Sequence, residues 1–469
     1  MKKPRVIKAS EEVQLALKKV ENSPTIEDRR NNLEALKIAR TNHRSLTRHH
    51  RNGWRKNHDE QFFDILSSKP TSAFSAVRAA KSSSQVQVPY ILVRGRKYIG
   101  DKVIDGFFDS LQTLKTLDYT ELEQNHHHHS LMQDYKYIRY LCSNKCDLPP
   151  ISLTKSNQIL TRIKASVIDF FSITAHHYIY AGQAGLVHFN FLLNVLIADV
   201  NNCSINELNT ILALLLHKGH EKDKTLDGSY RTISTCPLLA KSLDLYVRDL
   251  YIEKWNNCQA PTQYQGEGSS HGLASLLVTE VIQYSKYRSS LPIFLLFLDA
   301  KSAFDTVVGP YLVRKLFMTG MEGNSLLYTD IRLSSRITFC QFDKNVVGPI
   351  HDEHGVEQGG VSSSDFYKVY NNELLTTAQK SNLGAELGGS QIISAVGQAD
   401  DTVLVSNDIN KLQHILRLVL EYCKKFNVQL SSTKTKLIMI PTVKAKQFIP
   451  FNPVCINNEE IFYIDLCKF

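Results

Sequence analysis

Apolar residues recur at helical spacing in several long segments beyond residue 150. A helix is predicted to begin at Ser152 or Thr154, within the segment ISLTKSNQILTRIKASV. Residues 185–200 are apolar almost all the way round a helix, as expected of a helix that is buried in the core. Segments 236–255 and 269–287 have apolar positions three and four residues apart, which predicts helices that pack against the core.

Two shorter segments have the pattern of strands and carry acidic residues at their ends. Residues 292–298, PIFLLFL, are apolar on both faces, which predicts a strand buried in a sheet, with the following Asp299 at the edge of the sheet. Residues 392–405, IISAVGQADDTVLV, predict two strands joined by a tight turn that holds Asp400 and Asp401. An acidic pair at a hairpin is ordinarily a solvated turn, so a functional interpretation needs a third carboxylate from another strand.

Asp299 supplies this third carboxylate if its strand lies beside the hairpin. The side chains of Asp299 and Asp400 would then lie within a few ångströms of each other, and their repulsion is costly unless cations neutralise them. Mg²⁺ prefers oxygen ligands and completes its coordination with waters and phosphates. The pattern therefore favours a site for two Mg²⁺ ions.

The composition describes a globular, mildly basic protein with room for about three domains. The 469 residues are 43% hydrophobic, and 55 Lys and Arg residues against 46 Asp and Glu residues leave a net charge of +9, which suits a polyanionic partner without requiring one. The nine cysteines lack paired spacing apart from Cys142 and Cys146, which argues against a disulfide framework and for a reducing, intracellular compartment. No segment approaches the ~20 apolar residues of a membrane span, so neither insertion nor secretion is expected.

The N-terminal segment, up to about residue 60, is highly charged and favours helix. Its arginines recur at three- and four-residue spacing, which puts a basic stripe on one helical face, made of Arg40, Arg44, Arg48, Arg51 and Arg55. A solvated face and a face that follows nucleic-acid phosphates both remain open, and Trp54 favours the second. Residues 80–90 resemble a linker. The four histidines at 126–129 are predicted to form a polar loop, because four consecutive side chains cannot all face one tetrahedral ion.

Four segments in the second half of the chain resemble the palm motifs of reverse transcriptases, in particular those of LINE-like (non-LTR) retrotransposons. In chain order they are FLDAKSAFDTV (297–307), EQGGVSSSDFYKVYNNEL (357–374), GQADDTVLV (397–405) and NVQLSSTKTKLIMI (427–440). Upstream, residues 215–244 are similar to a finger motif of the same family, and residues 260–277 to a degraded form of the next one. Ordered motifs at this spacing are a specific signal, and the resemblance covers about residues 150–469.

The resemblance implies an α+β fold, the palm and fingers of a right-hand polymerase. Residues 1–149 are then expected to be a charged, largely helical N-terminal extension with a linker, residues 150–290 the fingers region, and residues 291–469 the palm. Antiparallel strands backed by helices would carry the acids on the open face of the palm. The chain is expected to end in a truncated primer-grip hairpin, without a thumb.

The implied activity is RNA-directed DNA polymerisation, in which a primer 3′-OH attacks the α-phosphate of a dNTP. Asp299 and Asp400 would bridge two Mg²⁺ ions, with Mn²⁺ as a substitute, and Asp401 would be a supporting or weaker ligand. Lys434 corresponds to the lysine that protonates or neutralises the leaving pyrophosphate. Asp305 shares the family pattern but is expected to be structural. The implied partners are an RNA template, a DNA primer and dNTPs.

Five residues match nucleotide-contacting positions of the family. Arg231 would grip the triphosphate through its planar guanidinium, with Lys218 assisting. Phe304 would lie beneath the sugar of the incoming nucleotide and exclude a 2′-OH, and packing in the core is the alternative for this ring. Gln358 would reach the nucleotide with its amide, and Gly359 would let backbone approach the base or sugar closely.

Two departures from the family pattern leave a second function open. Residues 263–272, QYQGEGSSHG, lack the arginine and lysines of the motif and gain Glu267, so this loop should hold template or triphosphate less tightly. The expected absence of a thumb leaves little to hold a primer–template duplex. The alternative is therefore a catalytically inactive retrotransposon-derived fragment that only binds nucleic acid. The resemblance suggests the nucleus as its compartment, although the sequence shows no convincing import signal.

Overall fold

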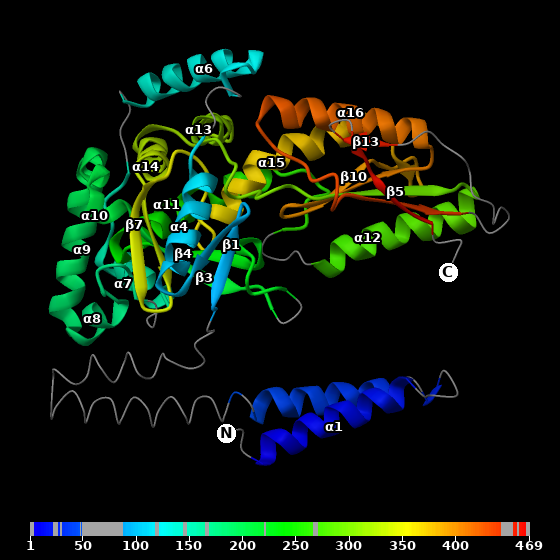
Figure 1. Cartoon of the computed structure of the whole chain (residues 1–469), viewed down its shortest axis with the longest axis horizontal. Helices are drawn as coiled ribbons and strands as arrows, with labels where there is room; N and C mark the ends of the chain where they lie inside the picture. Colours follow the sequence, from blue (N-terminus) through cyan, green and yellow to red (C-terminus); the bar gives the residue numbers. More distant parts are fainter. Residues whose placement is uncertain are drawn as a thin grey trace. The chain divides into compact units, whose positions relative to one another are not determined.

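The computed structural model has two compact units, Met1–Gln87 and Val88–Phe469, which are considered separately. The described residues are 4–21, 27–28, 31–46, 48, 88–117, 122–143, 148–164, 168–219, 222–265, 271–441, 454–456 and 459–465. In the first unit, helix α1 spans Pro4–Glu21, and residues 31–46 form a further helix (Figure 1). Three members of the predicted basic stripe are exposed, namely Arg40, Arg44 and Arg48. Its other two members, Arg51 and Arg55, and the nearby Trp54 lie outside the described residues.

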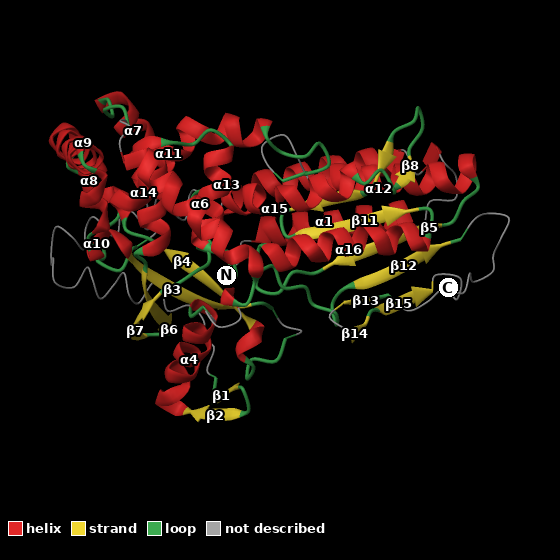
Figure 2. Ribbon diagram, turned by 90° about the horizontal axis from the view of Figure 1, so that it is seen from above, coloured by secondary structure: helices red, strands yellow, loops and turns green. Residues whose placement is uncertain are grey.

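A five-stranded sheet lies in the second unit. Its strands, in spatial order, are β10 (Ala395–Gln398), β11 (Asp401–Ser406), β5 (Ile293–Leu298), β12 (Lys436–Ile440) and β15 (Phe462–Asp465). The first four are antiparallel to their neighbours, whereas β15 runs parallel to β12 (Figure 2). The strand predicted at 292–298 and the hairpin predicted at 392–405 are thus confirmed, and they are neighbours.

Helices cover both faces of this sheet. Leu296 of β5 packs in the same core cluster as helices α15 (Ser363–Lys380) and α16 (Ile409–Lys425), whereas Leu295 packs with helix α12 (His271–Tyr284) on the other face. Figure 1 shows α15 and α16 on one side of β5 and α12 on the other. Successive side chains of a strand point to opposite faces, so a strand between two helical layers has to be apolar throughout.

A second sheet of four strands lies beside the first in the same unit. Its strands, in spatial order, are β4 (Tyr230–Thr235), β3 (Thr210–His217), β6 (Ile337–Phe342) and β7 (Asn345–His351). β3 runs parallel to β6, with Thr210 opposite Ile337, and the other pairs are antiparallel. This sheet therefore combines two strands that precede β5 in the sequence with two that follow it.

A small hairpin and a helix share the core of the second sheet. They are β1 (Tyr90–Val93), β2 (Arg96–Ile99) and α4 (Val103–Lys115). The ring of Phe107 in α4 lies 4.8 Å from that of Tyr230 in β4 and 4.7 Å from that of Phe342 in β6. Residues 88–117 thus belong to the same compact unit as both sheets, and the predicted boundaries at residues 150 and 291 stay predictions.

The remaining helices surround the two sheets. The longer ones are α6 (His126–Ser143), α7 (Leu153–Arg162), α9 (Gly182–Ala198), α11 (Leu238–Asn257), α13 (Gly309–Met318) and α14 (Gly323–Ser334). Short elements are η1 (Gly100–Lys102), α8 (Ala175–Tyr180), η2 (Val200–Ser204), α10 (Asn206–Asn209), η3 (Asp227–Ser229), η4 (Ser285–Ser289), β8 (Ala385–Glu386), β9 (Ile392–Ile393), β13 (Cys455–Ile456) and β14 (Glu459–Glu460). This mixture of helices and sheets agrees with the predicted α+β class.

One predicted helix start is confirmed and one predicted loop is wrong. The Ser152 side chain accepts a hydrogen bond from the backbone N of Lys155 at 3.1 Å, so it caps α7. The histidines at 126–129 begin helix α6 instead of forming a loop. Asn125 makes this possible, because its Oδ1 accepts from the backbone N of His127 at 3.1 Å and its amide donates to the carbonyl of Lys424 at the end of α16.

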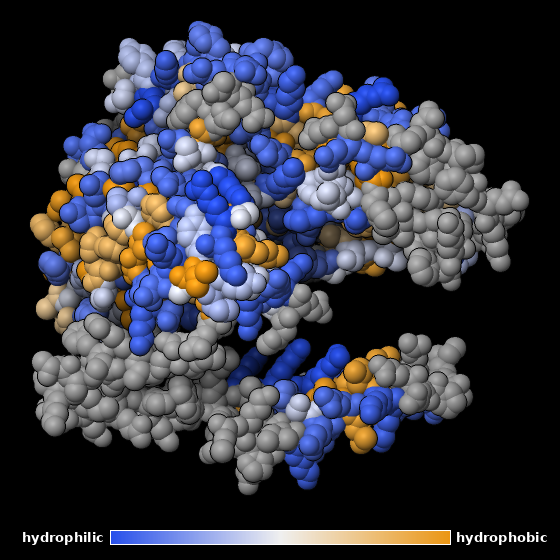
Figure 3. All heavy atoms as spheres, in the orientation of Figure 1, coloured by the Kyte–Doolittle hydropathy of each residue, from blue (hydrophilic) through white to orange (hydrophobic). Residues whose placement is uncertain are grey.

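Helix α9 also differs from its prediction, because it is buried on one side only. It packs against α7 and α11, whereas Val187, Phe191 and Val195 on the opposite side are 50%, 62% and 43% exposed. Figure 3 shows hydrophobic side chains gathered over this region of α8 and α9. Among the helices in the described ranges, none combines the length and apolar character that crossing a membrane requires.

Candidate active site

Two acidic residues from separate motifs lie side by side at one end of the five-stranded sheet. β5 and β11 are antiparallel, with Thr402 opposite Leu298. One residue further along the same register, Asp401 precedes Thr402 at the start of β11 and Asp299 follows Leu298 at the end of β5. The pairing of the two strands therefore brings the predicted acids of both motifs to the same edge.

The turn between β10 and β11 adds the third acid. Gln398 pairs with Asp401 across the hairpin, which leaves Ala399 and Asp400 as its two-residue turn. Ala399 has a φ of +60°, a left-handed conformation that favours glycine and is costly for other residues. The two flanking strands hold the turn in this form, and Asp400 and Asp401 are exposed at its end.

Lys434 reaches Asp299 from the opposite neighbour of β5. Its Nζ lies 3.2 Å from Oδ2 of Asp299. Two backbone contacts fix this segment, since Asp299 N donates to Oγ1 of Thr435 at 3.3 Å and Ser431 N donates to the carbonyl of Asp299 at 2.8 Å. The Lys434 side chain is 68% exposed, so its ammonium group can leave Asp299 and follow a ligand.

The three carboxylates influence one another electrostatically. Partial burial raises the pKa of Asp401, and the negative charges of Asp400 and Asp299 raise it further, while His271 at the start of α12 opposes them. The folded protein thus binds this proton more tightly than the unfolded chain, so stability falls as pH rises through the pKa of Asp401. A cation bound among the carboxylates would remove this penalty.

The donor set fits a hard divalent cation in part. Carboxylate oxygens are the ligands that Mg²⁺ prefers, and the buried Oδ2 of Asp299 contacts the exposed Lys434 ammonium group, which a metal ion could replace. In the same residues, no three His, Cys, Asp or Glu side chains are grouped as a ready-made metal site. Mg²⁺ is commonly held by one or two carboxylates together with water and substrate phosphates, so a nucleotide would complete the ligand set.

Mg²⁺ together with a dNTP is expected to stabilise the folded protein at neutral pH. A ligand at 100 times its Kd adds about 2.7 kcal/mol to the free energy of unfolding, which raises the melting temperature by a few degrees. Asp401→Asn should stabilise the metal-free protein and shrink this increase, and acidification through the pKa of Asp401 should reduce it too. Thermal unfolding with and without both ligands checks this, and an increase equal in wild type and variant contradicts it.

Three cations from two of the motifs lie near the carboxylates. Lys218 follows β3, and Arg231 is exposed on β4. Leu216 of β3 pairs with Arg231, which puts Lys218 two residues beyond this pair. Partial burial lowers the pKa of Lys218, and the positive charges of Lys434 and then Arg231 lower it further. The structure therefore brings these three predicted residues from the two sheets to one place.

The predicted residues Gln358 and Gly359 lie against β4. The backbone N of Ser234 donates to the carbonyl of Gln358 at 2.7 Å. Gly359 has a φ of +104°, and a Cβ there would lie 3.1 Å from the carbonyl oxygen of Ser234, so only glycine suits this approach. The amide of Gln358 donates to Oδ2 of Asp305 at 3.4 Å. In this structure, that amide is therefore engaged by Asp305.

Phe304, in the motif at residues 297–307, is half-buried against the motif at residues 357–374. Its ring stacks on that of Tyr367 in α15, with centroids 5.1 Å apart and an angle of 19° between the planes. Its carbonyl accepts from the backbone N of Val356 at 2.7 Å. The ring thus contacts the core while part of it stays accessible, so both predicted roles agree with its position.

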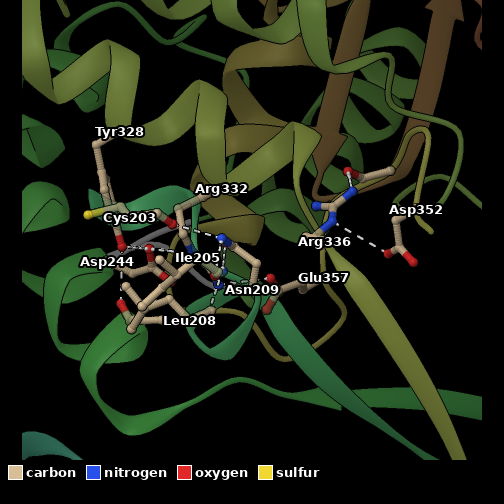
Figure 4. A network of polar contacts seen from close by, with 12 residues as sticks. Cys203, Ile205, Leu208, Asn209, Asp244, Tyr328, Arg332, Arg336, Asp352 and Glu357 are labelled. Carbon is tan, nitrogen blue, oxygen red and sulfur yellow. Dashed lines mark hydrogen bonds and ion pairs between the residues drawn. The ribbon is translucent and has the colours of Figure 1, made fainter. Parts of the chain in front are cut away.

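A buried polar network supports the segment that precedes Gln358 (Figure 4). Arg332 of α14 donates to Oδ1 of Asn209 at 2.7 Å and to Oε1 of Glu357 at 3.2 Å, and lies 3.5 Å from Asp244. Arg336 donates to the carbonyl of Gly355 at 2.6 Å. Both guanidinium groups are almost wholly buried, so their partners determine the path of this segment.

Lys115, the last residue of α4, joins the same region from outside the predicted motifs. Its Nζ lies 3.5 Å from Oδ1 of Asp305 and 3.3 Å from Oδ2 of Asp352, and Arg336 lies 3.4 Å from the same oxygen of Asp352. Asp305 is 8% exposed and faces this ion pair, which agrees with its expected structural role.

Sequence reasoning missed three residues at this site. Lys115 lies outside the recognised motifs, His271 lies in the degraded one, and Tyr367 has the apolar spacing of a packing residue. Burial raises the pKa of Tyr367, and the negative charges of Asp400 and Asp401 raise it further. The unusual loop at 263–272 is described in part: Tyr264 N donates to the carbonyl of Gly397 in β10 at 2.8 Å, whereas Glu267 lies outside the described residues.

The two sheets bring the predicted acids and cations to one region of the second unit. The model of the family described as reverse transcriptase (RNA-dependent DNA polymerase) matches residues 219–464, just over half of the chain. The chain therefore belongs to the reverse transcriptase family, which confirms the prediction of a reverse transcriptase, while its LINE-like subtype stays a prediction. Among the curated proteins, none matches this sequence.

Proposed function

We propose that this protein is an RNA-directed DNA polymerase that transfers a nucleotidyl group from a dNTP to a primer 3′-OH. The five-stranded sheet would be the palm, and β3 and β4 of the four-stranded sheet would belong to the fingers. The observation that carries the proposal is the register of β5 and β11, which puts Asp299 beside Asp401 and the Asp400 turn. The match of residues 219–464 to the reverse transcriptase family and the cations Lys218, Arg231 and Lys434 support it.

Asp299, Asp400 and Asp401 would hold Mg²⁺ in this mechanism. Bound Mg²⁺ would lower the pKa of the attacking 3′-OH and neutralise charge on the departing pyrophosphate. Arg231 and Lys218 would bind the triphosphate oxygens, since a guanidinium pairs well with phosphate and an ammonium adds a point charge. Lys434 would exchange its contact with Asp299 for the pyrophosphate, which its exposed side chain permits.

The direct test is primer extension on a poly(rA) template with an oligo(dT) primer. Incorporation of dTTP that needs Mg²⁺ or Mn²⁺, and that removal of the ion by a chelator abolishes, supports catalysis. Equal background with and without protein, together with measurable RNA binding, would leave only the alternative of a protein that binds nucleic acid. The LINE-like origin of the chain, and a nuclear role, stay predictions from its motifs.

Phe304→Val is expected to reduce discrimination against ribonucleotides. A smaller side chain beneath the sugar leaves room for a 2′-OH, and steric contacts of this size change selectivity by ~1–3 kcal/mol, which corresponds to about 5- to 150-fold. The ratio of kcat/KM for dTTP and UTP measures the effect. The control is Phe317→Val in α13, which also removes part of a ring packed on the core. The assignment fails if both variants keep the wild-type ratio.

A further inference from the structure

We propose that the groove between the β1–β2 hairpin and α4 binds single-stranded RNA next to the polymerase site. This inference rests on the proposed function, because it identifies the occupant as the template strand. The groove lies outside the residues that match the family, 219–464. Its volume is about 690 Å³.

Two arginines give the groove its charge. Arg94 lies in the hairpin turn, where a φ of +49° at this residue and +78° at Gly95 reverse the chain. Arg96 and Tyr98 both lie on the groove face of β2, because alternate residues of a strand point the same way. Both arginines are exposed, and neither has an ion pair with the described residues.

The opposite wall combines one acid with neutral polar groups. Asp109 of α4 accepts a short hydrogen bond from the Tyr98 hydroxyl, so this carboxylate is engaged within the protein. Gln112 and Thr113, on the same face of α4, are exposed in the groove. Guanidinium groups bind phosphodiesters, and amide and hydroxyl groups can contact bases and the 2′-OH of RNA. The combination suits a nucleic-acid strand without a strict sequence requirement.

Backbone hydrogen bonds connect the elements of the groove to two segments that carry predicted nucleotide-binding residues. In the hairpin, Leu92 N donates to the carbonyl of Thr225 at 2.7 Å, which lies between Lys218 and Arg231 in the chain. At the other end, Glu353 N donates to the carbonyl of Lys115 at 3.0 Å. Glu357 and Gln358 follow Glu353 by four and five residues in the chain. A strand in the groove would therefore lie on the same compact unit as the predicted nucleotide-binding residues.

A single strand fits these observations better than a free nucleotide. A triphosphate concentrates its charge and needs several cations around it, whereas here two arginines share the groove with Asp109. A strand presents one phosphate to each arginine and gains affinity from contacts elsewhere on the protein. Free dNTP should accordingly compete poorly with RNA at this groove.

The first test compares two double variants that remove the same charge. Arg94→Gln/Arg96→Gln alters the groove, whereas Lys97→Gln/Lys102→Gln removes two exposed cations that do not line it, one of them 4.0 Å above the ring of Tyr90. RNA oligonucleotide binding is measured over a range of salt concentrations. Loss of two phosphate contacts should make the log–log slope shallower by about 1.4, because each contact to a single strand contributes roughly 0.7.

The proposal requires this change in the arginine variant and a smaller one in the lysine variant. Equal slopes for the two variants would overturn it, because net charge alone would then explain binding. An arginine variant with the wild-type slope would also overturn it. These outcomes need no polymerase activity, so they are independent of the proposed function.

Primer extension then connects the groove with the template. The arginine variant should match wild type on templates whose single-stranded overhang is a few nucleotides long, and should lose affinity for templates with long overhangs. Wild-type protein that extends neither template would refute the proposed function instead. Equal loss on short and long overhangs would overturn the groove as a template site.

Discussion

Asp400→Asn is expected to reduce the rate of nucleotide incorporation about 10³-fold while the protein stays folded. The substitution keeps the size of the side chain but removes a charge at the turn between β10 and β11. Charge stabilisation by bound metal contributes several kcal/mol to such reactions, and a loss of roughly 4 kcal/mol corresponds to about 10³-fold. Steady-state primer extension at saturating dTTP measures the effect.

The matched control for this variant is Asp105→Asn in α4. Asp105 is also exposed, so its replacement makes the same chemical change far from the three carboxylates in sequence. It should leave the rate of incorporation within about twofold, since Asp105 is not one of the predicted site residues. It should also change stability little, because an exposed charge near a helix start contributes only ~0.3–1 kcal/mol. Thermal unfolding confirms that both variants fold. Retention of full activity by Asp400→Asn would refute the polymerase assignment.

Arg332→Met should have the largest effect on stability, lowering the free energy of unfolding by about 3–5 kcal/mol. Arg332 is 6% exposed and lies between Asp244 and Glu357, both of which would lose their cation. A buried carboxylate without a partner is strongly destabilising. Denaturant unfolding of the whole chain measures the change.

A second substitution separates the ion pair from loss of packing. Burial raises the pKa of Glu357, and the positive charge of Arg332 opposes this shift. Combining Arg332→Met with Glu357→Gln removes the stranded charge, so the double variant should be less destabilised than the sum of the single variants. Arg417→Met on the exposed side of α16 should change stability by no more than about 0.5 kcal/mol. Additive effects would show that Arg332 acts through packing alone.

The local pattern of the sequence determined the strands that carry the acids. Residues 292–298 are apolar on both faces because helices cover both sides of β5, and this requirement is visible without any long-range information. The hairpin at 392–405 was equally clear, since two apolar runs flank a short acidic turn. Ordered motifs also identified the family correctly.

Side chains that depend on distant partners could not be predicted in this way. The four histidines at 126–129 begin a helix because Asn125 contacts the end of α16, about 300 residues away in the chain. Phe191 in α9 is exposed although its segment has the composition of a buried helix, because no described element packs over that side. Composition specifies how apolar a helix is, but neighbouring elements decide how much of it they cover.

The sequence by itself thus determined the strands that carry the acids and the family of the chain. Only the tertiary structure decided which of these residues meet. The pairing of Thr210 with Ile337 and the contact of Lys115 with Asp305 join segments more than a hundred residues apart. Periodicity describes one element at a time, whereas such contacts arise from the simultaneous packing of many elements and the need to pair buried charges.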